Sequence, residues 1–235
     1  MKTLIISDLH GHTTWEDIIK KEKPNKTIFL GDYVDTFDRN NTPEMQINNL
    51  ERILDYKEKR GNKCILLLGN HDFSYISKFG QTCSGFNSLT KRLFDTIKDR
   101  FISNVQLIYI DNKLKTIFSH AGVSQYWLDE VACCKLKDVP NLDFCSHVVE
   151  FNYITGFNTY GDTISQSPIW IRPSSLMESY IKGYNQVVGH TPYRSIRTHE
   201  TLNKETLYFC DALPHQYLVI EDGAFRIETY QNFTN

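Results

Sequence analysis

The sequence has no long apolar run, so a membrane-spanning segment is not expected. A span needs roughly 20 consecutive apolar residues, and no stretch of the chain approaches that length. Before its first aspartate the chain offers only Leu4, Ile5 and Ile6 as consecutive apolar residues, too few for the core of a secretory signal. We therefore expect a cytoplasmic protein that does not associate with membranes.

The chain also has no surplus of charge. Lysine and arginine total 26 against 28 for aspartate and glutamate, which gives a formal net charge of -2. Binding of an extended nucleic acid usually requires a clear excess of positive charge. The balance argues against that class of partner.

No Cys-x-x-Cys pair, internal repeat or linker is present. The 6 cysteines are scattered through a chain that is large enough to bury a core without disulfides. We therefore expect reduced cysteines that pack as small apolar side chains, and no structural zinc. The length of 235 residues predicts a single domain over residues 1–235.

Short apolar runs alternate with helical patterns in the N-terminal part of the chain, which is typical of a sheet with crossover helices. The predicted strands are Thr3–Ser7, Thr27–Leu30, Lys63–Leu68, Val105–Ile110, Lys113–Phe118, Gln186–Val188, Leu207–Cys210, Tyr217–Glu221 and Ala224–Tyr230. The predicted helices are Thr14–Lys23, Pro43–Arg60 and Ser88–Lys98. The segment Trp127–Tyr184 is irregular and receives no assignment.

Polar blocks follow predicted strands at the points where the strands end. These blocks are Asp8–His10, Gly31–Asp35, Gly69–Asp72, Ser119–Gly122 and Gly189–Thr191. Each block alone is ordinary turn chemistry. Because loops at the carboxyl ends of strands form the ligand crevice of open α/β sheets, their repetition predicts one shared site. The mixed Asp, Asn and His donors suit Mn, Fe or Zn.

These blocks resemble the motifs of the calcineurin-like metallophosphoesterases. Gly31–Asp35, Gly69–Asp72 and Ser119–Gly122 look most like the bacterial type of the phosphoprotein (serine/threonine) phosphatase branch, and the blocks occur in the family's order. The resemblance implies an α/β fold in which two β-sheets pack face to face with helices outside.

The resemblance also implies two divalent metal ions, with Mn as the first expectation and Fe or Zn as alternatives. The implied ligands are Asp8, His10 and Asp32 for the first ion, and Asp32, Asn70, His120 and His190 for the second. Asp32 would bridge the pair. A hydroxide held between the ions would then attack phosphorus in line with the leaving group.

Two residues resemble the family's acid catalyst. His71 would donate a proton to the leaving group, and Asp35 would keep His71 protonated. The alternative for this pair is a simple buried His–Asp hydrogen bond.

Phosphate recognition follows the family in part. Arg172, within Pro168–Pro173, resembles the phosphate-binding arginine of bacterial members, although an exposed surface arginine is the alternative. Asn70 is also predicted to contact the phosphate. After Asp35 the family continues with Arg-Gly, which this chain lacks. Arg39 is the candidate replacement, with a solvated loop charge as the alternative.

The predicted function is hydrolysis of a phosphomonoester, such as phosphorylated serine or threonine or a small phosphorylated metabolite. A dinucleoside polyphosphate hydrolase or another phosphodiesterase is the alternative enzyme, and the wall Tyr153–Arg172 should separate them. This region contains the aromatic residues Phe151, Tyr153, Phe157 and Tyr160. They are predicted to line a specificity pocket, with packing in the core as the alternative. A non-catalytic scaffold is disfavoured because every implied ligand position is filled.

Overall fold

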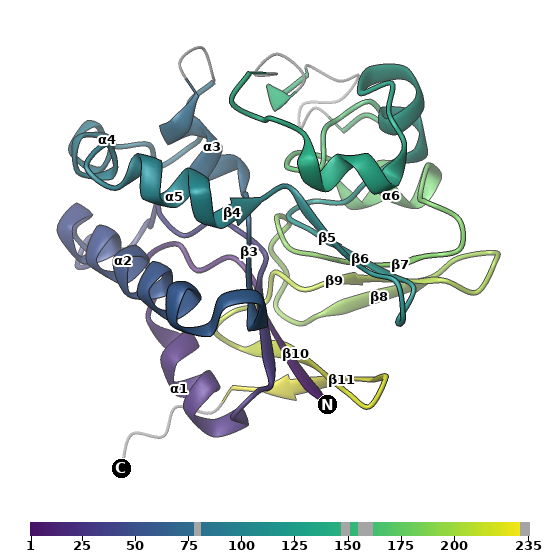
Figure 1. Cartoon of the computed structure of the whole chain (residues 1–235), viewed down its shortest axis with the longest axis horizontal. Coiled ribbons are helices and arrows are strands. Elements are labelled where there is room, and N and C mark those ends of the chain that lie inside the picture. Colours follow the sequence, from purple (N-terminus) through teal and green to yellow (C-terminus); the bar gives the residue numbers. More distant parts are fainter. Residues whose placement is uncertain (78–80, 147–150, 155–161, 231–235) are drawn as a thin grey trace.

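Two β-sheets lie face to face with helices on their outer sides in the computed structural model (Figure 1). The structure describes residues 1–77, 81–146, 151–154 and 162–230. This arrangement confirms the predicted α/β sandwich. Within the described residues, no helix combines the length and the apolar character needed to cross a membrane.

The first sheet has the strand order β11-β10-β1-β2-β3-β4, and the second β5-β6-β7-β9-β8. The strands of the first sheet are β1 (Lys2–Ile6), β2 (Lys26–Phe29), β3 (Cys64–Leu67), β4 (Val105–Gln106), β10 (Gln216–Glu221) and β11 (Ala224–Thr229). Those of the second are β5 (Ile108–Asp111), β6 (Thr116–Ser119), β7 (Asn185–Val188), β8 (Arg197–Glu200) and β9 (Thr206–Phe209). The α-helices are α1 (Thr14–Glu22), α2 (Pro43–Arg60), α3 (Asn70–Ile76), α4 (Ser88–Phe94), α5 (Lys98–Asn104) and α6 (Pro173–Glu178).

Strand direction decides where the site can form. The neighbours β1, β2 and β3 run parallel in the first sheet, and β6, β7 and β9 run parallel in the second. Parallel neighbours end at the same edge of their sheet, so their carboxyl-terminal loops gather there.

Side-chain alternation along each strand builds separate core layers. In β1, Leu4 and Ile6 pack in the cluster that contains Trp15 of α1. Ile5, between them, points the other way and packs with Phe118 of the second sheet. A third cluster, which includes Leu176 of α6, covers the other face of the second sheet. The sandwich is thus closed by apolar contacts on both faces.

The predicted strand Val105–Ile110 is wrong as a single element. Val105 pairs with Leu66 in the first sheet, whereas Ile108 pairs with Ser119 in the second. The chain crosses from one sheet to the other at Leu107, which is 1% exposed. An apolar run that stays buried while it changes sheets has the sequence pattern of one longer strand.

The predicted helix Ser88–Lys98 ends early, at Phe94, and α5 follows after a short turn. Phe94 and Phe101 are both fully buried and pack edge to face, with ring centroids 5.1 Å apart. The turn between the helices brings these two rings together. The prediction also missed α3, α6 and the edge strand β8, whose four residues are all exposed and carry no apolar pattern.

All six cysteines are free thiols, in line with the expected reduced state. Cys64 and Cys210 are buried in the core. Cys133 and Cys145 are exposed, so the expectation of buried cysteines holds for only part of the set.

Polar contacts to Glu22 join α1 to the first sheet. The Tyr217 hydroxyl donates to Glu22 at 2.8 Å, and the Lys2 ammonium lies 3.2 Å from the same carboxylate. Burial alone would raise the pKa of Glu22, but these two partners and Lys21 hold it below its usual range. A lowered folded-state pKa adds stability above the unfolded value near pH 4.5 and loses it as the pH falls further.

We predict that Glu22→Gln lowers the melting temperature by about 2–4 °C at neutral pH, equivalent to about 1 kcal/mol. The loss should shrink as the pH falls below 4.5, because the wild-type carboxylate then loses its charge. Thermal unfolding of both proteins at neutral pH and at a pH below 4.5 measures this loss. Glu16→Gln, on an exposed face of the same helix, is the control and should change little. An equal loss at both pH values would attribute the effect to packing.

Candidate metal centre

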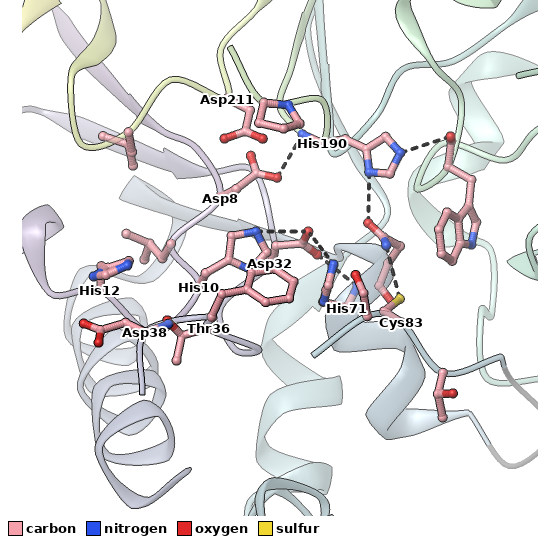
Figure 2. A pocket seen from close by; sticks show the side chains of 18 of the residues that line it. Asp8, His10, His12, Asp32, Thr36, Asp38, His71, Cys83, His190 and Asp211 are labelled. Atoms are coloured by element: carbon pink, nitrogen blue, oxygen red, sulfur yellow. Dashed lines mark hydrogen bonds and ion pairs between the residues drawn. The ribbon is translucent and has the colours of Figure 1, made fainter. Parts of the chain in front are cut away.

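The carboxyl-terminal loops of five strands line one cavity of about 710 Å³. The strands are β1, β2 and β3 of the first sheet and β7 and β9 of the second. The sequence-predicted residues that line it are Asp8, His10, Asp32, Asn70, His71, Arg172 and His190 (Figure 2). His120 is fully buried behind them and contacts Asn70 and His190.

Asp32 is the centre of this arrangement. Its Oδ2 atom lies 4.0 Å from Nε2 of His10, 4.0 Å from Nε2 of His71 and 3.4 Å from Nε2 of His120. Two groups with metal-ligand spacing share it. One is His10, Asp32 and His71, and the other is Asp8, Asp32 and His120, with the atoms of each group within 4.8 Å of one another.

Backbone carbonyls fix the orientation of three histidine rings. The contacts are His10 Nδ1 to Val34 O at 3.1 Å, His120 Nδ1 to Leu30 O at 2.8 Å, and His190 Nε2 to Trp170 O at 3.1 Å. A neutral imidazole carries one N–H, and a carbonyl can only accept. Each ring therefore keeps its hydrogen on the carbonyl side and leaves the other nitrogen as a lone-pair donor for a metal.

Two of these nitrogens and the side-chain oxygen of Asn70 face one another. Nε2 of His120 lies 3.2 Å from Nδ1 of His190, and Oδ1 of Asn70 lies 2.8 and 3.0 Å from these nitrogens. The Asn70 amide nitrogen points away and donates to the Cys83 sulfur at 3.2 Å. Burial, followed by the neighbouring His120 and Arg172, lowers the pKa of His190 well below its usual range, so this ring stays neutral. Converging acceptors without a hydrogen between them fit a divalent cation.

Asp211 is a cavity residue that the sequence analysis missed. Figure 2 shows it beside Asp8. Burial and the charges of Asp8 and Asp32 raise the pKa of Asp211 to about 9, so a divalent cation bound here would relieve the repulsion among these carboxylates. Asp211 follows the predicted strand Leu207–Cys210 at once, which is the same signal that singled out the other blocks.

Four of these residues have an unusual backbone. The φ angles of His10, Asp32, Asp35 and His190 are 44°, 55°, 69° and 66°. Left-handed conformations are uncommon outside glycine and cluster at functional sites, where the surroundings hold them. Here, for example, the His190 N–H donates to Asp8 at 2.9 Å. Three of the four residues, His10, Asp32 and His190, line the cavity, so local backbone strain is concentrated there.

His71 and Asp35 form the predicted pair, with Nδ1 of His71 3.0 Å from the Asp35 carboxylate. Burial would lower the pKa of His71, but the charges of Asp32 and Asp35 outweigh it and raise the pKa to about 9. The imidazole is therefore protonated at neutral pH, with Nε2 on the side of Asp32.

Of the two predicted phosphate arginines, the structure brings only Arg172 to the cavity. Its Nη1 atom donates to the Thr191 hydroxyl at 3.1 Å and to the His190 carbonyl at 3.3 Å. Arg39 is exposed and is absent from the cavity wall. The Asp38 carboxylate caps a local turn by accepting the Asn40 N–H at 2.9 Å, and this turn places Thr36, Phe37 and Asp38 at the cavity instead.

The irregular segment contributes both to the wall and to the core. Tyr153 and Trp170 line the cavity, whereas Phe151 is buried against Phe73 with ring centroids 6.0 Å apart. Phe157 and Tyr160, the other aromatic candidates, lie outside the described residues. Of these predicted aromatics, Tyr153 therefore lines the cavity, whereas Phe151 packs in the core.

Gly189 permits a close approach that this site requires. A Cβ atom there would lie 2.1 Å from Oδ2 of Asp8 and 2.7 Å from the Ser7 hydroxyl. Both distances are too short for a real contact, so a side chain at this position would displace the Asp8 carboxylate.

We predict that Gly189→Ala weakens Mn²⁺ binding by about 10- to 100-fold, as is usual when the support of a metal ligand is disturbed. Calorimetric titration of the metal-free protein measures it. Gly183→Ala serves as the control, because its φ of 82° strains an alanine but no atom lies within 4 Å of the added carbon. Unchanged affinity in Gly189→Ala would remove Asp8 from the metal site.

Known proteins are similar to this chain in sequence or in fold. A model of the calcineurin-like phosphoesterase family matches residues 1–208. A symmetrical bis(5'-nucleosyl)-tetraphosphatase of Buchnera aphidicola subsp. Baizongia pistaciae (strain Bp) is 29% identical over 100 residues, or 40% of this chain. The match spans only 36% of the length of that enzyme.

Two solved structures share the fold at low identity. A cold-active protein-tyrosine phosphatase of a psychrophilic Shewanella species has a TM-score of 0.63 at 17% identity and covers 98% of this chain and 80% of its own. A protein serine/threonine phosphatase of Saccharomyces cerevisiae has a TM-score of 0.63 at 14% identity, with the same coverage. At these identities the likeness concerns the fold alone.

Proposed function

Because the chain belongs to the calcineurin-like phosphoesterase family and is therefore a hydrolase, we propose that it cleaves phosphomonoesters with the help of two divalent metal ions. The supporting observation is the charge of the cavity wall. Among the described residues, the wall carries one guanidinium, that of Arg172, and four carboxylates. Two divalent cations and one guanidinium suit a single dianionic phosphate better than a chain of phosphates.

In this proposal the metal ligands are Asp8, His10, Asp32, Asn70, His120 and His190. Bound divalent ions would stabilise charge on the phosphoryl oxygens and lower the pKa of water. Asp32 would serve both ions, because its Oδ2 atom faces histidines of both ligand sets. Mn is the first choice of metal, since the mixed oxygen and imidazole donors suit borderline cations.

The remaining residues act on the substrate. His71 carries a proton that its Nε2 atom can give to the leaving oxygen, and Asp35 holds the ring through Nδ1. Both hydrogen bonds of Arg172 given above use its Nη1 atom. The other guanidinium nitrogens can therefore bind phosphoryl oxygens. The Asn70 amide lies between the cavity and the buried histidines, where it can also meet the phosphate.

Hydrolysis of a dinucleoside polyphosphate is the second candidate. The similarity to the symmetrical tetraphosphatase over 100 residues favours it. A dinucleoside polyphosphate carries several adjacent phosphate charges, and the described cavity wall offers one guanidinium to bind them. This charge balance disfavours the second candidate.

We predict that chelation abolishes activity and that Mn²⁺ restores it, with para-nitrophenyl phosphate as the reporter. On the reloaded enzyme, phosphoserine peptides and small phosphomonoesters should be turned over with at least about tenfold higher kcat/KM than diadenosine tetraphosphate, a difference of about 1.4 kcal/mol. The reverse order would establish the second candidate. A protein that binds Mn²⁺ but hydrolyses no member of the panel would be a scaffold.

We also predict different losses for two ligand-like residues. His71→Asn should lower turnover of an alkyl phosphate by about 100-fold or more, because a poor leaving group needs the proton. Its Mn²⁺ content should stay near that of the wild type. Asp32→Asn should lose both metal and activity. Full activity of His71→Asn on the alkyl phosphate, or loss of its metal, would refute the acid assignment.

A further inference from the structure

Tyr75 lies behind the His71–Asp35 pair and is fully buried. It follows His71 by four residues on α3, so the two side chains project from the same face of the helix. The Asp35 carboxylate lies between them. Its Oδ2 atom is 3.0 Å from Nδ1 of His71, and its Oδ1 atom accepts a hydrogen bond from the Tyr75 hydroxyl.

The direction of that hydroxyl is fixed by its surroundings. The Asn87 backbone N–H donates to the Tyr75 oxygen at 3.1 Å, so the hydroxyl hydrogen is left to point at Asp35. The ring is stacked between Phe86 and Phe94, with centroid distances of 4.8 and 5.4 Å. Neither the ring nor its hydrogen can turn without losing these contacts.

The Asp35 carboxylate depends on this contact. Its side chain is 0% exposed, so water cannot replace a missing partner. The described residues supply one partner to each carboxylate oxygen, His71 and Tyr75. A buried carboxylate is stable as an anion only when its oxygens accept hydrogen bonds. Donation by Tyr75 to Oδ1 therefore fixes the carboxylate in the orientation in which Oδ2 faces Nδ1 of His71.

We propose that Tyr75 is a positioning residue for proton donation: its hydroxyl holds the Asp35 carboxylate in the orientation in which Oδ2 accepts from Nδ1 of His71. This inference rests on the proposed acid role of His71. Tyr75 is absent from the described cavity wall, and its hydroxyl contacts Asp35 and Asn87, so its effect should be confined to steps that need the proton.

The test is Tyr75→Phe, which removes one oxygen and keeps the stacked ring. We expect turnover of an alkyl phosphate to fall about tenfold more than turnover of para-nitrophenyl phosphate, whose good leaving group needs little proton transfer. Calorimetric Mn²⁺ affinity should be unchanged. The Nδ1 proton resonance of His71, followed by NMR, should shift because its acceptor is no longer held.

Tyr217→Phe is the matched control, since this buried hydroxyl also donates to a carboxylate, that of Glu22, but far from the cavity wall. Tyr217→Phe should lower the stability of the protein but should not change the ratio of its turnover of the alkyl phosphate to its turnover of para-nitrophenyl phosphate. If Tyr75→Phe does not fold, difluorotyrosine at position 75 retains ring and hydroxyl while making the proton more acidic. The His71 Nδ1 resonance should then shift.

His71→Asn separates failure of this inference from failure of the proposed function. If His71→Asn shows the leaving-group-dependent loss and Tyr75→Phe does not, the role of Tyr75 is overturned while the acid role stands. If His71→Asn shows no such loss, the acid role falls and the inference falls with it. In a His71→Asn background, Tyr75→Phe should cause no further leaving-group-dependent loss. An additional loss of that kind would also overturn the proposal.

Discussion

The site depends on one buried carboxylate, that of Asp72, which ties the loop after β2 to the loop after β3. It accepts the backbone N–H groups of Asp32, Tyr33 and Gly69 at 2.8, 2.9 and 3.1 Å. These bonds pull the loops so close that a side chain at Gly69 would lie 2.1 Å from Oδ1 of Asp32. At that separation the His71 N–H reaches Oδ1 at 3.0 Å, and Oδ2 is left to face the histidines.

Polar bonds at the cavity also cross between the two sheets. The carbonyl of Leu30, after β2, accepts from His120, after β6. The carboxylate of Asp8, after β1, accepts from His190, after β7. Away from the cavity, the same sheets meet through apolar side chains such as Ile5 and Phe118. The apolar interface thus fixes the spacing of the sheets. The polar bonds at the cavity then bring the proposed ligands from both sheets close to one another.

The sequence could predict that these residues gather at one cavity because their blocks follow strands whose apolar runs are easy to see. Asp8, Asp32, Asn70, His120 and His190 lie in such blocks, and the same rule applied to Leu207–Cys210 would have found Asp211. What it could not predict depends on tertiary context. The crossing at Leu107 and the turn between α4 and α5 depend on burial of particular side chains against distant partners. The outward direction of Arg39 depends on a turn capped by its neighbour Asp38.

The two halves of the site are supported by different parts of the fold. The proposed metal ligands sit on strand ends, where converging acceptors and crowded carboxylates favour a bound cation. The proposed proton-donating pair is supported from the helical side, where Tyr75 on α3 donates to Asp35 and the Asn87 N–H, just before α4, donates to Tyr75. The halves meet at Asp32, whose Oδ2 atom lies near both His71 and His120. A cation bound there would compete with His71 for the same carboxylate charge. The Asp35 carboxylate, which accepts from Nδ1 of His71, would then be the main support for the His71 proton, and Tyr75, which donates to Asp35, would hold that carboxylate in place.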